Sequence, residues 1–271
     1  MSISHDISLI LVLVVSVLAF AIGLLVGKGA PKWIKAGMAI ATLLIVLRFT
    51  LLRNPQIEYH LFEGDWYSVV RPWWGFPPAM FLTGAAIFQV KRFSVRVLAK
   101  AAAAIVFYVA TRTVVASLMI DHSERMENFP DPNTGLVAQK TLYSCGAACA
   151  AMLLHFEGIQ ASEGEMATIC RTNAATATDE FNVRRGLREK LAGTGKNVVI
   201  EHLDFESLLK MPNRPFMAVI EFQHLLDHWV VVESISDDQK TFRILDPKGT
   251  IIEYTKANFK AIWKNRILFI E

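Results

Sequence analysis

Four apolar stretches fill most of the first 120 residues and limit what this chain can fold into. Each is close to the roughly 20 residues that an α-helix needs to cross a hydrocarbon core about 30 Å thick. We predict membrane spans over about residues 7–27, 36–52, 73–90 and 101–120. The composition agrees with this prediction, because 53% of the residues are apolar and only 20% are charged. The chain is therefore expected to be a multi-pass protein of the cytoplasmic membrane, with the lipid bilayer as a partner.

Two of these stretches depart from the simplest picture of a span. A cleaved signal peptide is the rival interpretation of residues 7–27, but no Lys or Arg precedes the stretch and no small-residue cleavage site leads into polar chain. We therefore interpret it as a permanent span. The third stretch is the least regular, because Pro77 and Pro78 are expected to remove backbone hydrogen bonds and kink the helix.

The charged residues of the connectors predict the orientation of the spans. Cytoplasmic loops retain an excess of Lys and Arg. Seven such residues lie in the first and third connectors: Lys28, Lys32, Lys35, Lys91, Arg92, Arg96 and Lys100. These two connectors are therefore expected in the cytoplasm, and both chain termini on the outer face. Because the excess of positive charge lies in short connectors, no nucleic-acid partner is expected.

Two arginines and an aromatic cluster stand out within the apolar half. Ionisable residues inside a span are costly, so Arg48 and Arg112 are candidates for a functional role. Arg48 lies near the end of its span, and its side chain could instead snorkel to the headgroups. Four aromatic residues lie where the second connector meets the third span: Trp66, Tyr67, Trp73 and Trp74. Such a cluster is typical of an anchor at the membrane interface.

Residues 121–271 predict a separate domain in which helices precede strands. Residues 145–158 are rich in Ala and Leu and end on a glycine, which is typical of a helix. Ser162 and Glu165 form a capping box that predicts the start of a second helix. A third helix is expected over residues 181–191.

The spacing of the apolar residues changes after Gly195, from a pattern typical of helices to one typical of strands. Five short runs rich in β-branched and aromatic residues follow, separated by turn residues: NVVIEHL, FMAVIEF, HWVVVESI, TFRILDP and TIIEYT. The sequence thus predicts an α+β domain in which a helical half packs on an antiparallel sheet. The expected organisation is a four-span α-helical transmembrane domain over 1–120, a tether over 121–135 and the α+β domain over 136–271.

Cys145 is the candidate nucleophile among the three cysteines. It opens the first helix of the second half, and the unpaired N–H groups and macrodipole at a helix amino end favour the reactive thiolate. A free Cys is also often a small buried hydrophobe, and position alone leaves that alternative open. Cys149, one turn further along among alanines, is expected in the core. Cys149 and Cys170 could pair in an oxidising exterior, which the sequence does not decide.

A thiolate nucleophile needs a base, a group that orients the base and donors for the oxyanion. His228 opens the run HWVVVESI and could act as the base, and Asp246 at the close of the next run could fix its tautomer. Gln139, six residues before Cys145, could donate its side-chain amide to the oxyanion. Each residue also has an alternative without a catalytic role. His228 could be a histidine of the core, Asp246 a turn residue before a proline, and Gln139 a solvated loop residue.

A metal site is the competing arrangement. His224 and His228 have the spacing HxxxH, but the string HLLDH lacks the Glu after the first His that a zinc peptidase uses. Residues four apart also do not share a helical face when they lie at the start of a strand. We therefore expect neither a metal nor a cofactor.

Several segments together resemble the bacteriocin-processing cysteine peptidase family. They are QKTLYSCGAACAAMLLHF, HWVVVES and ILDPKGT, with SEGEMATICRT and the closing NFKAIWKNRILFI, and they cover residues 136–271. Members of this family are papain-like domains, best known at the front of peptide-exporting ABC transporters, that cut after a double-glycine leader. The resemblance implies a papain-like fold. It also implies these roles: Cys145 as nucleophile, His228 as base, Asp246 as its orienting partner and Gln139 as oxyanion donor.

The chain departs from the family pattern in three respects. Ser144 stands where the family often has Asp, and NAATATDEF replaces a Gly-containing turn, so substrate contacts near residues 176–180 are expected to differ. The string GxxxxGK[ST] of an ATP-binding cassette does not occur, and the predicted spans precede the domain instead. In the transporter relatives the peptidase faces the cytoplasm. Here the charge pattern predicts that it faces outward, in an extracytoplasmic or periplasmic position.

These features predict a membrane-anchored cysteine endopeptidase that cleaves peptide or leader sequences. Cleavage after small residues, of the Gly-Gly or Gly-Ala type, is implied by the family resemblance alone. The expected partners are a peptide or protein substrate and a peptide exporter or other membrane protein. Two alternatives stay open. The domain could bind peptides without cutting, although the retained Cys145, His228 and Asp246 argue against it, or the spans could form a scaffold or transport subunit.

Overall fold

The computed structural model of the chain describes residues 2–29, 31–62, 67–68, 71, 74–89, 97, 100, 104–105, 107–108, 127–174, 177–212, 215–223 and 226–271. The chain divides into two compact units, Met1–Met119 and Ile120–Glu271. Most of the predicted fourth span lies outside the described residues, as does Arg112.

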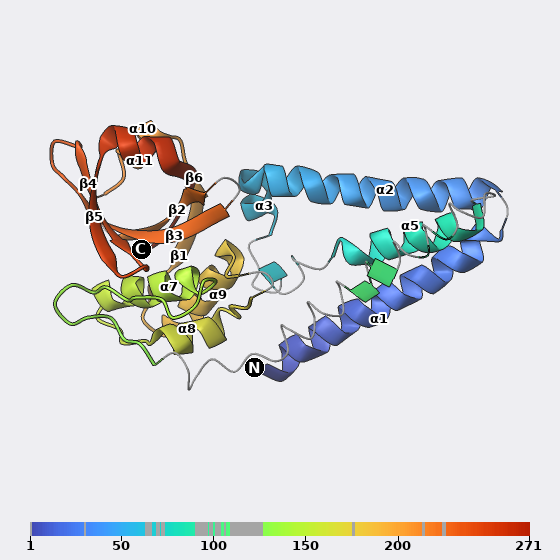
Figure 1. Cartoon of the computed structure of the whole chain (residues 1–271), viewed down its shortest axis with the longest axis horizontal. Helices are drawn as coiled ribbons and strands as arrows, with labels where there is room; N and C mark the ends of the chain where they lie inside the picture. Colours follow the sequence, from blue (N-terminus) through green and yellow to red (C-terminus); the bar gives the residue numbers. More distant parts are fainter. Residues whose placement is uncertain are drawn as a thin grey trace. The chain divides into compact units, whose positions relative to one another are not determined.

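Helices form in the N-terminal unit where the first three apolar stretches predict them. The bounds are α1 Ser2–Gly27, α2 Pro31–Arg53, α3 Pro55–Leu61 and α5 Phe76–Gln89 (Figure 1). The predicted kink in the third stretch is wrong. Pro77 and Pro78 lie in the first turn of α5, where the missing N–H groups have no helical partner to lose. The prolines therefore begin this helix instead of bending it.

Membrane-spanning length is reached by one helical segment in the part of the chain whose side chains are described. That segment is Lys32–Leu51, with 20 residues and a mean hydropathy of 1.8. Val14–Gly27 and Phe76–Ile87 are shorter apolar helices, and the side chains of residues 2–13 in α1 are not among those described. The number of spans therefore stays a prediction.

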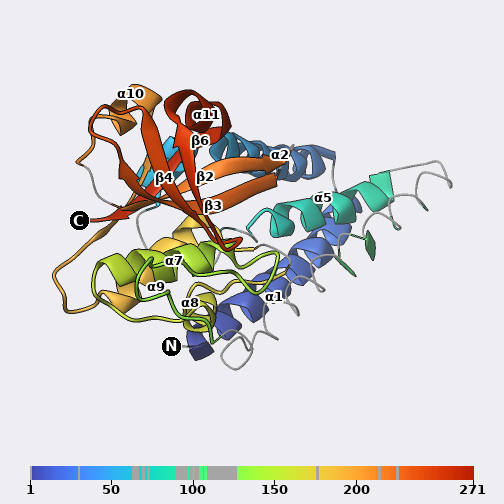
Figure 2. The same ribbon diagram turned by 60° about the vertical axis from the view of Figure 1, so that its left-hand side comes forward.

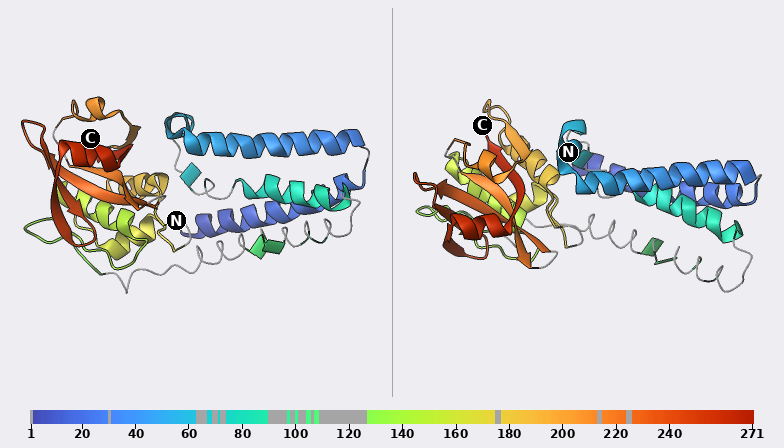
Figure 3. Two further views of the ribbon diagram at one scale, coloured as in Figure 1. Left: turned by 45° about the horizontal axis from the view of Figure 1, so that its top comes forward. Right: turned by 90° about the horizontal axis from the view of Figure 1, so that it is seen from above.

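Glycines allow α1 and α5 to lie side by side (Figure 3). A Cβ added at Gly23 of α1 would overlap the carbonyl oxygen of Phe81, and one added at Gly84 of α5 would overlap that of Phe20. Only glycine permits so close a backbone approach. Small residues at such contacts are typical of helices that pack in membranes.

The C-terminal unit is a sheet with helices on both faces (Figure 2). Three helices cover one face: α7 Cys145–Phe156, α8 Glu163–Ile169 and α9 Glu180–Lys190. Two further helices cover the other face: α10 Phe205–Leu208 and α11 Lys256–Ile262. Helices α7, α8 and α9 are those that the sequence predicts. The Ser162 hydroxyl accepts from the Glu165 N–H, so the predicted cap of α8 is formed.

The sheet has six strands, and every pair of neighbours is antiparallel, as predicted. Their bounds are β1 Val198–His202, β2 Phe216–Gln223, β3 Leu226–Ile235, β4 Thr241–Asp246, β5 Thr250–Thr255 and β6 Trp263–Ile270. The order is β1-β6-β2-β3-β4-β5, so the last strand of the chain lies inside the sheet. His228 is the third residue of β3, not the first, because pairing with β2 begins at Leu226.

Two layers of core hold the sheet in place. Under α10 and α11 an aromatic cluster forms, in which the rings of Phe242 and Phe259 stack with centroids 4.5 Å apart. On the opposite face, α7 is buried along its first ten residues, 145–154. The run of small alanines lets this helix lie close to the sheet. The helix that begins with Cys145 is therefore a rigid support.

Candidate active site

Cys145 is the first residue of α7 and is 8% exposed. The residue before it, Ser144, does not cap the helix with its side chain. Its hydroxyl donates instead to the carbonyl oxygen of Thr141 over 3.1 Å and accepts from the Thr141 hydroxyl over 2.8 Å. The thiol thus lies at an amino end where the helix dipole favours negative charge.

His228 links Cys145 to Asp246. Its Nε2 lies 2.9 Å from Oδ1 of Asp246, and its ring lies close enough to Cys145 for that residue to raise the pKa of the imidazole. Since Nε2 is engaged by the carboxylate, Nδ1 is the ring nitrogen left to react with the thiol. The N–H of Lys248 donates to the same carboxylate oxygen over 2.9 Å, which fixes Asp246 at the end of β4. Three of the residues predicted from the sequence are therefore brought together.

The charges of Cys145, His228 and Asp246 stabilise one another. Burial by itself lowers the pKa of His228, but hydrogen bonds and negative charge from Asp246 and Cys145 outweigh it and raise the pKa from 6.5 to about 9. Burial also opposes the ionisation of Asp246, yet the bonds from His228 and from the Lys248 N–H hold its pKa below the ordinary 3.8. At neutral pH the pair is therefore an imidazolium and a carboxylate.

Gln139 lies beside the site with its backbone fixed. Its N–H donates to the carbonyl oxygen of Pro247 over 2.6 Å, directly after Asp246. Its side-chain Nε2 donates to the carbonyl oxygen of Thr141 over 2.6 Å. One N–H of the amide is thus used by the loop that leads to Cys145, and an amide nitrogen carries two. Only the second N–H of the Gln139 amide is therefore left to donate to an oxyanion.

The other two cysteines are free thiols in the interior, not a disulfide. Burial raises the pKa of Cys149, and the nearby charges of Cys145 and Asp246 raise it further. Burial likewise raises the pKa of Cys170 to about 12. Both stay protonated at neutral pH, so neither competes with Cys145 as a nucleophile. His224, the partner of His228 in the HxxxH spacing, lies outside the described residues.

A cavity of about 690 Å³ adjoins His228 and Asp246. Apolar side chains of β2, β5 and α11 line it, and Phe222 lies at its edge with its ring 5.8 Å from the imidazole. The ammonium group of Lys248 lies 2.9 Å from the centroid of the Phe222 ring. Apolar and polar side chains therefore share the wall beside the imidazole, and Cys145 is not among the residues that line this cavity.

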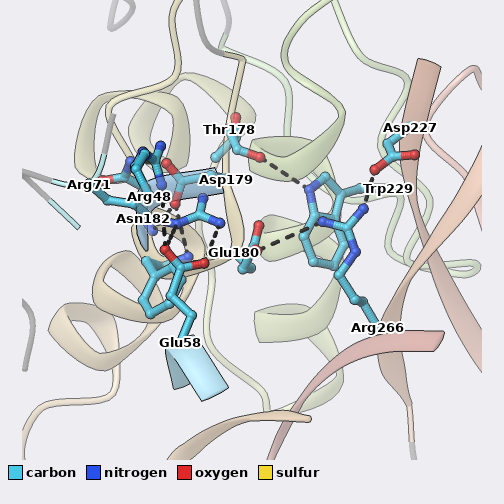
Figure 4. Close-up of polar contacts among 11 residues, drawn as sticks. Arg48, Glu58, Arg71, Thr178, Asp179, Glu180, Asn182, Asp227, Trp229 and Arg266 are labelled. Carbon is cyan, nitrogen blue, oxygen red and sulfur yellow. Dashed lines mark hydrogen bonds and ion pairs between the residues drawn. The ribbon is translucent and has the colours of Figure 1, made fainter. Parts of the chain in front are cut away.

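Sequence reasoning missed the residues that surround His228 in β3. Trp229 donates its indole N–H to the carbonyl oxygen of Thr178, and Asp227 pairs with Arg266 of β6 (Figure 4). The sequence offered one indication, because Thr178 lies in the segment that departs from the family pattern. An aromatic residue in an apolar run otherwise indicates only a buried strand.

The N-terminal unit has a charged cluster of its own around Glu58, which is fully buried. Arg71 donates to both carboxylate oxygens over 2.9 Å (Figure 4). The Tyr67 hydroxyl donates to one of them over 2.6 Å. Arg48 lies 3.7 Å from the same carboxylate and over the ring of Trp74. Arg48 therefore has a partner of opposite charge within its unit. Trp66 and Trp73 lie outside the described residues.

Known proteins provide three comparisons with this chain. Residues 133–271 match the peptidase C39 family. Curated proteins give no match. Among solved structures, one similar chain is a double glycine motif protease from an AMS/PCAT transporter in complex with the leader peptide. It is 19% identical with a TM-score of 0.43, over 55% of this chain and 94% of that one.

Two further structures are similar to about half of the chain. The peptidase domain of Streptococcus ComA, a bifunctional ABC transporter involved in quorum sensing, is 20% identical with a TM-score of 0.44, over 50% of this chain and 96% of that one. The N-terminal peptidase C39 like domain of the toxin secretion ATP-binding protein from Vibrio parahaemolyticus is 12% identical. Its TM-score is 0.35, over 49% of this chain and 98% of that one.

Proposed function

The chain belongs to the peptidase C39 family and is a cysteine peptidase, and on that premise we propose that it cleaves peptide or leader sequences while anchored in the membrane. The observation that carries the proposal is the contact of one imidazole, His228, with both a thiol and a carboxylate. We assign Cys145 as nucleophile, His228 as acid and base, and Asp246 as the group that orients the imidazole. Cleavage after small residues, of the Gly-Gly or Gly-Ala type, is part of the proposal.

The reaction is an acyl transfer in two steps. The Cys145 thiolate attacks the peptide carbonyl carbon, the C–N bond breaks, and His228 gives its proton to the leaving amine. A water molecule then attacks the thioester and His228 takes a proton from that water. The C–S bond breaks, which releases the acid product and restores the Cys145 thiolate beside the imidazolium. Asp246 keeps the imidazole in one orientation through both steps, because it accepts from Nε2.

The oxyanion of each tetrahedral intermediate needs donors that are already in place. We assign this role to the backbone N–H of Cys145 and to the second N–H of the Gln139 amide. The first N–H of that amide is held by Thr141, and the Gln139 backbone is held by Pro247. Both bonds limit the motion of the side chain, which is what a preorganised donor requires.

The membrane part of the proposal has three elements. Four spans over 1–120 anchor the chain, a tether over 121–135 follows, and the peptidase domain over 136–271 lies on the outer face of the cytoplasmic membrane. The Lys and Arg of the first and third connectors support this orientation. Tethering confines the encounter with substrate to a thin layer above the bilayer and raises its effective concentration. A peptide exporter or another membrane protein is the natural source of that substrate.

The test compares Cys145→Ala with Cys149→Ala in the purified full-length chain. The probe is a fluorogenic peptide with Gly-Gly before the cut. We expect Cys145→Ala to lower the cleavage rate by about 10,000-fold or more. Cys149→Ala removes a buried sulfur of the same helix and is expected to keep most of the activity. A Cys145→Ala chain that is folded and still cuts at the wild-type rate would contradict the proposal.

A further inference from the structure

The strand that carries His228 is fastened to residues 178–180, which lead into α9 (Figure 4). Trp229, the next residue of β3, donates its indole N–H to the backbone carbonyl oxygen of Thr178 over 3.1 Å. Both residues are buried, so water does not compete for this bond. Thr178 is fixed in turn, because its hydroxyl bonds that of Thr172 over 2.6 Å.

Two ion pairs of Arg266 also hold residues 178–180 to this strand. They act through Asp227, the residue before His228. Asp227 pairs with Arg266 of β6, and the guanidinium of Arg266 also lies 3.8 Å from the carboxylate of Glu180 (Figure 4). Glu180 begins α9 and is 3% exposed, and a buried carboxylate needs such a partner. The residues that flank His228 in the strand, Asp227 and Trp229, share one face of it. The segment is therefore held from both sides of the histidine.

The indole of Trp229 also reaches the helix that carries the nucleophile. A Cβ added at Gly146, the residue after Cys145, would lie 3.2 Å from Cδ1 of Trp229 and 2.8 Å from Cβ of Thr178. The indole and Thr178 therefore fill the space beside the first turn of α7, and glycine is the residue that leaves room for them. One side chain thus bridges the supports of the thiol and the imidazole.

We propose that Trp229 is a positioning residue that sets the distance between Cys145 and His228, by spanning from β3 to the first turn of α7. The ion pairs of Arg266 with Asp227 and Glu180 hold in place the segment that contains Thr178, to which Trp229 is hydrogen-bonded. This inference rests on the proposed function, since it requires that thiol and imidazole react as a pair. The effect on rate is large for a small displacement, because a misplacement of about 1 Å costs about 100-fold.

The test uses the full-length chain in detergent micelles with two probes. Iodoacetamide measures the reactivity of the Cys145 thiol, and the fluorogenic Gly-Gly peptide measures turnover. Trp229→Phe keeps an aromatic ring and removes the indole N–H. We expect kcat to fall about tenfold with KM within about twofold. Alkylation of Cys145 is expected to slow by a similar factor, and the alkaline limb of the kcat profile to move to lower pH.

Trp263→Phe is the matched control. Trp263 is buried in the aromatic core on the α11 side of the sheet, so its loss lowers the unfolding temperature without removing the bond between Trp229 and Thr178. The proposal is wrong if Trp229→Phe has the kcat, alkylation rate and pH profile of Trp263→Phe. Should Trp229→Phe fail to fold, Asp227→Asn replaces it, because the Asp227 side chain is half exposed. We expect this variant to lose about threefold in kcat, and an unchanged kcat overturns the proposal.

The wild-type chain separates this inference from the function on which it rests. If iodoacetamide labels Cys145 and the peptide is cut, the proposed function stands, and the variants decide the role of Trp229. If the wild-type thiol is not labelled and the peptide is not cut, the proposed function itself fails.

Discussion

At the scale of single residues, the chemistry depends on His228, because its ring contacts both Asp246 and Cys145. The carboxylate and the thiol raise the pKa of the imidazole from 6.5 to about 9. The protonated ring therefore stabilises the fold fully below pH 6.5, and this contribution is lost as the pH rises through about 9. The same protonated form supplies the proton that the leaving amine needs.

The pH dependence of cleavage follows from this titration. We expect kcat/KM of the wild-type chain to fall as the pH rises through about 9, because the imidazolium is lost there. Asp246→Ala removes a negative charge and a hydrogen-bond acceptor. It is therefore expected to move this alkaline fall of kcat/KM to lower pH, and to lower kcat/KM by about 100-fold. Steady-state rates between pH 5 and pH 10 measure both effects, in buffers of about constant ionic strength.

Asp246→Asn serves as the control for that prediction. Its amide oxygen still accepts from the imidazole but carries no charge. This variant is expected to shift the alkaline limb to lower pH while losing less activity than Asp246→Ala. An alkaline limb that stays in place in both variants would show that the carboxylate does not set the protonation of His228.

At the scale of elements, α9 packs against the end of α8 through a glycine. A Cβ added at Gly186 of α9 would overlap Sγ of Cys170, which follows α8. Ala is ordinarily the better helix former by about 1 kcal/mol. At Gly186 the close contact with Cys170 outweighs the higher helix propensity of Ala, because a closely packed interior has no room for an extra methyl group.

Gly186→Ala is therefore expected to destabilise the chain, by about 1–2 kcal/mol. The measurement is thermal unfolding of the purified variant. The double variant Cys170→Ala with Gly186→Ala removes the sulfur from the contact and is expected to recover most of the loss. A single Gly186→Ala variant that unfolds at a higher temperature than the wild type would show that the two helices are not in this contact.

The sequence predicts elements better than it predicts pairings. Helices α7, α8 and α9 follow from local features such as the Ser162 cap and the Ala- and Leu-rich run that ends on Gly158, because such signals act over a few residues. The position of β6 between β1 and β2 joins distant segments, and loop closure of that kind leaves no local pattern.

The candidate site divides in the same way. Cys145, His228 and Asp246 could be proposed because each lies at or near the end of an element that the local sequence marks, and the family resemblance joins them. The contact between Trp229 and Thr178 joins positions 51 apart. It depends on a close approach at Gly146, which cannot be predicted before the helix and the strand are placed together.

At the scale of the whole molecule, the proposal joins a peptidase domain to a membrane region. The connector charges support an outward-facing peptidase. That orientation determines which peptides the domain meets, because a cytoplasmic leader and an exported peptide lie on opposite sides of the bilayer.

A reporter fused after Glu271 tests the orientation. In the proposed topology, four spans would place both termini on the outer side. We therefore expect a signal from a reporter that works only outside the cytoplasm, and none from a reporter that works only inside it. Charge reversal of the first connector, Lys28 and Lys32 to Glu, is expected to reduce the outward signal. Reporter activity confined to the cytoplasm would contradict the orientation and move cleavage inside.

The most direct test of the central claim is competition for the thiol in the native chain. A peptide aldehyde that ends in Gly-Gly is added before iodoacetamide, and mass spectrometry of peptides then locates the label. We predict labelling of Cys145 ahead of Cys149 and Cys170, because the latter two are buried and protonated, and protection of Cys145 by the aldehyde. Labelling of Cys149 or Cys170 first, or a Cys145 that the aldehyde fails to protect, would contradict the account.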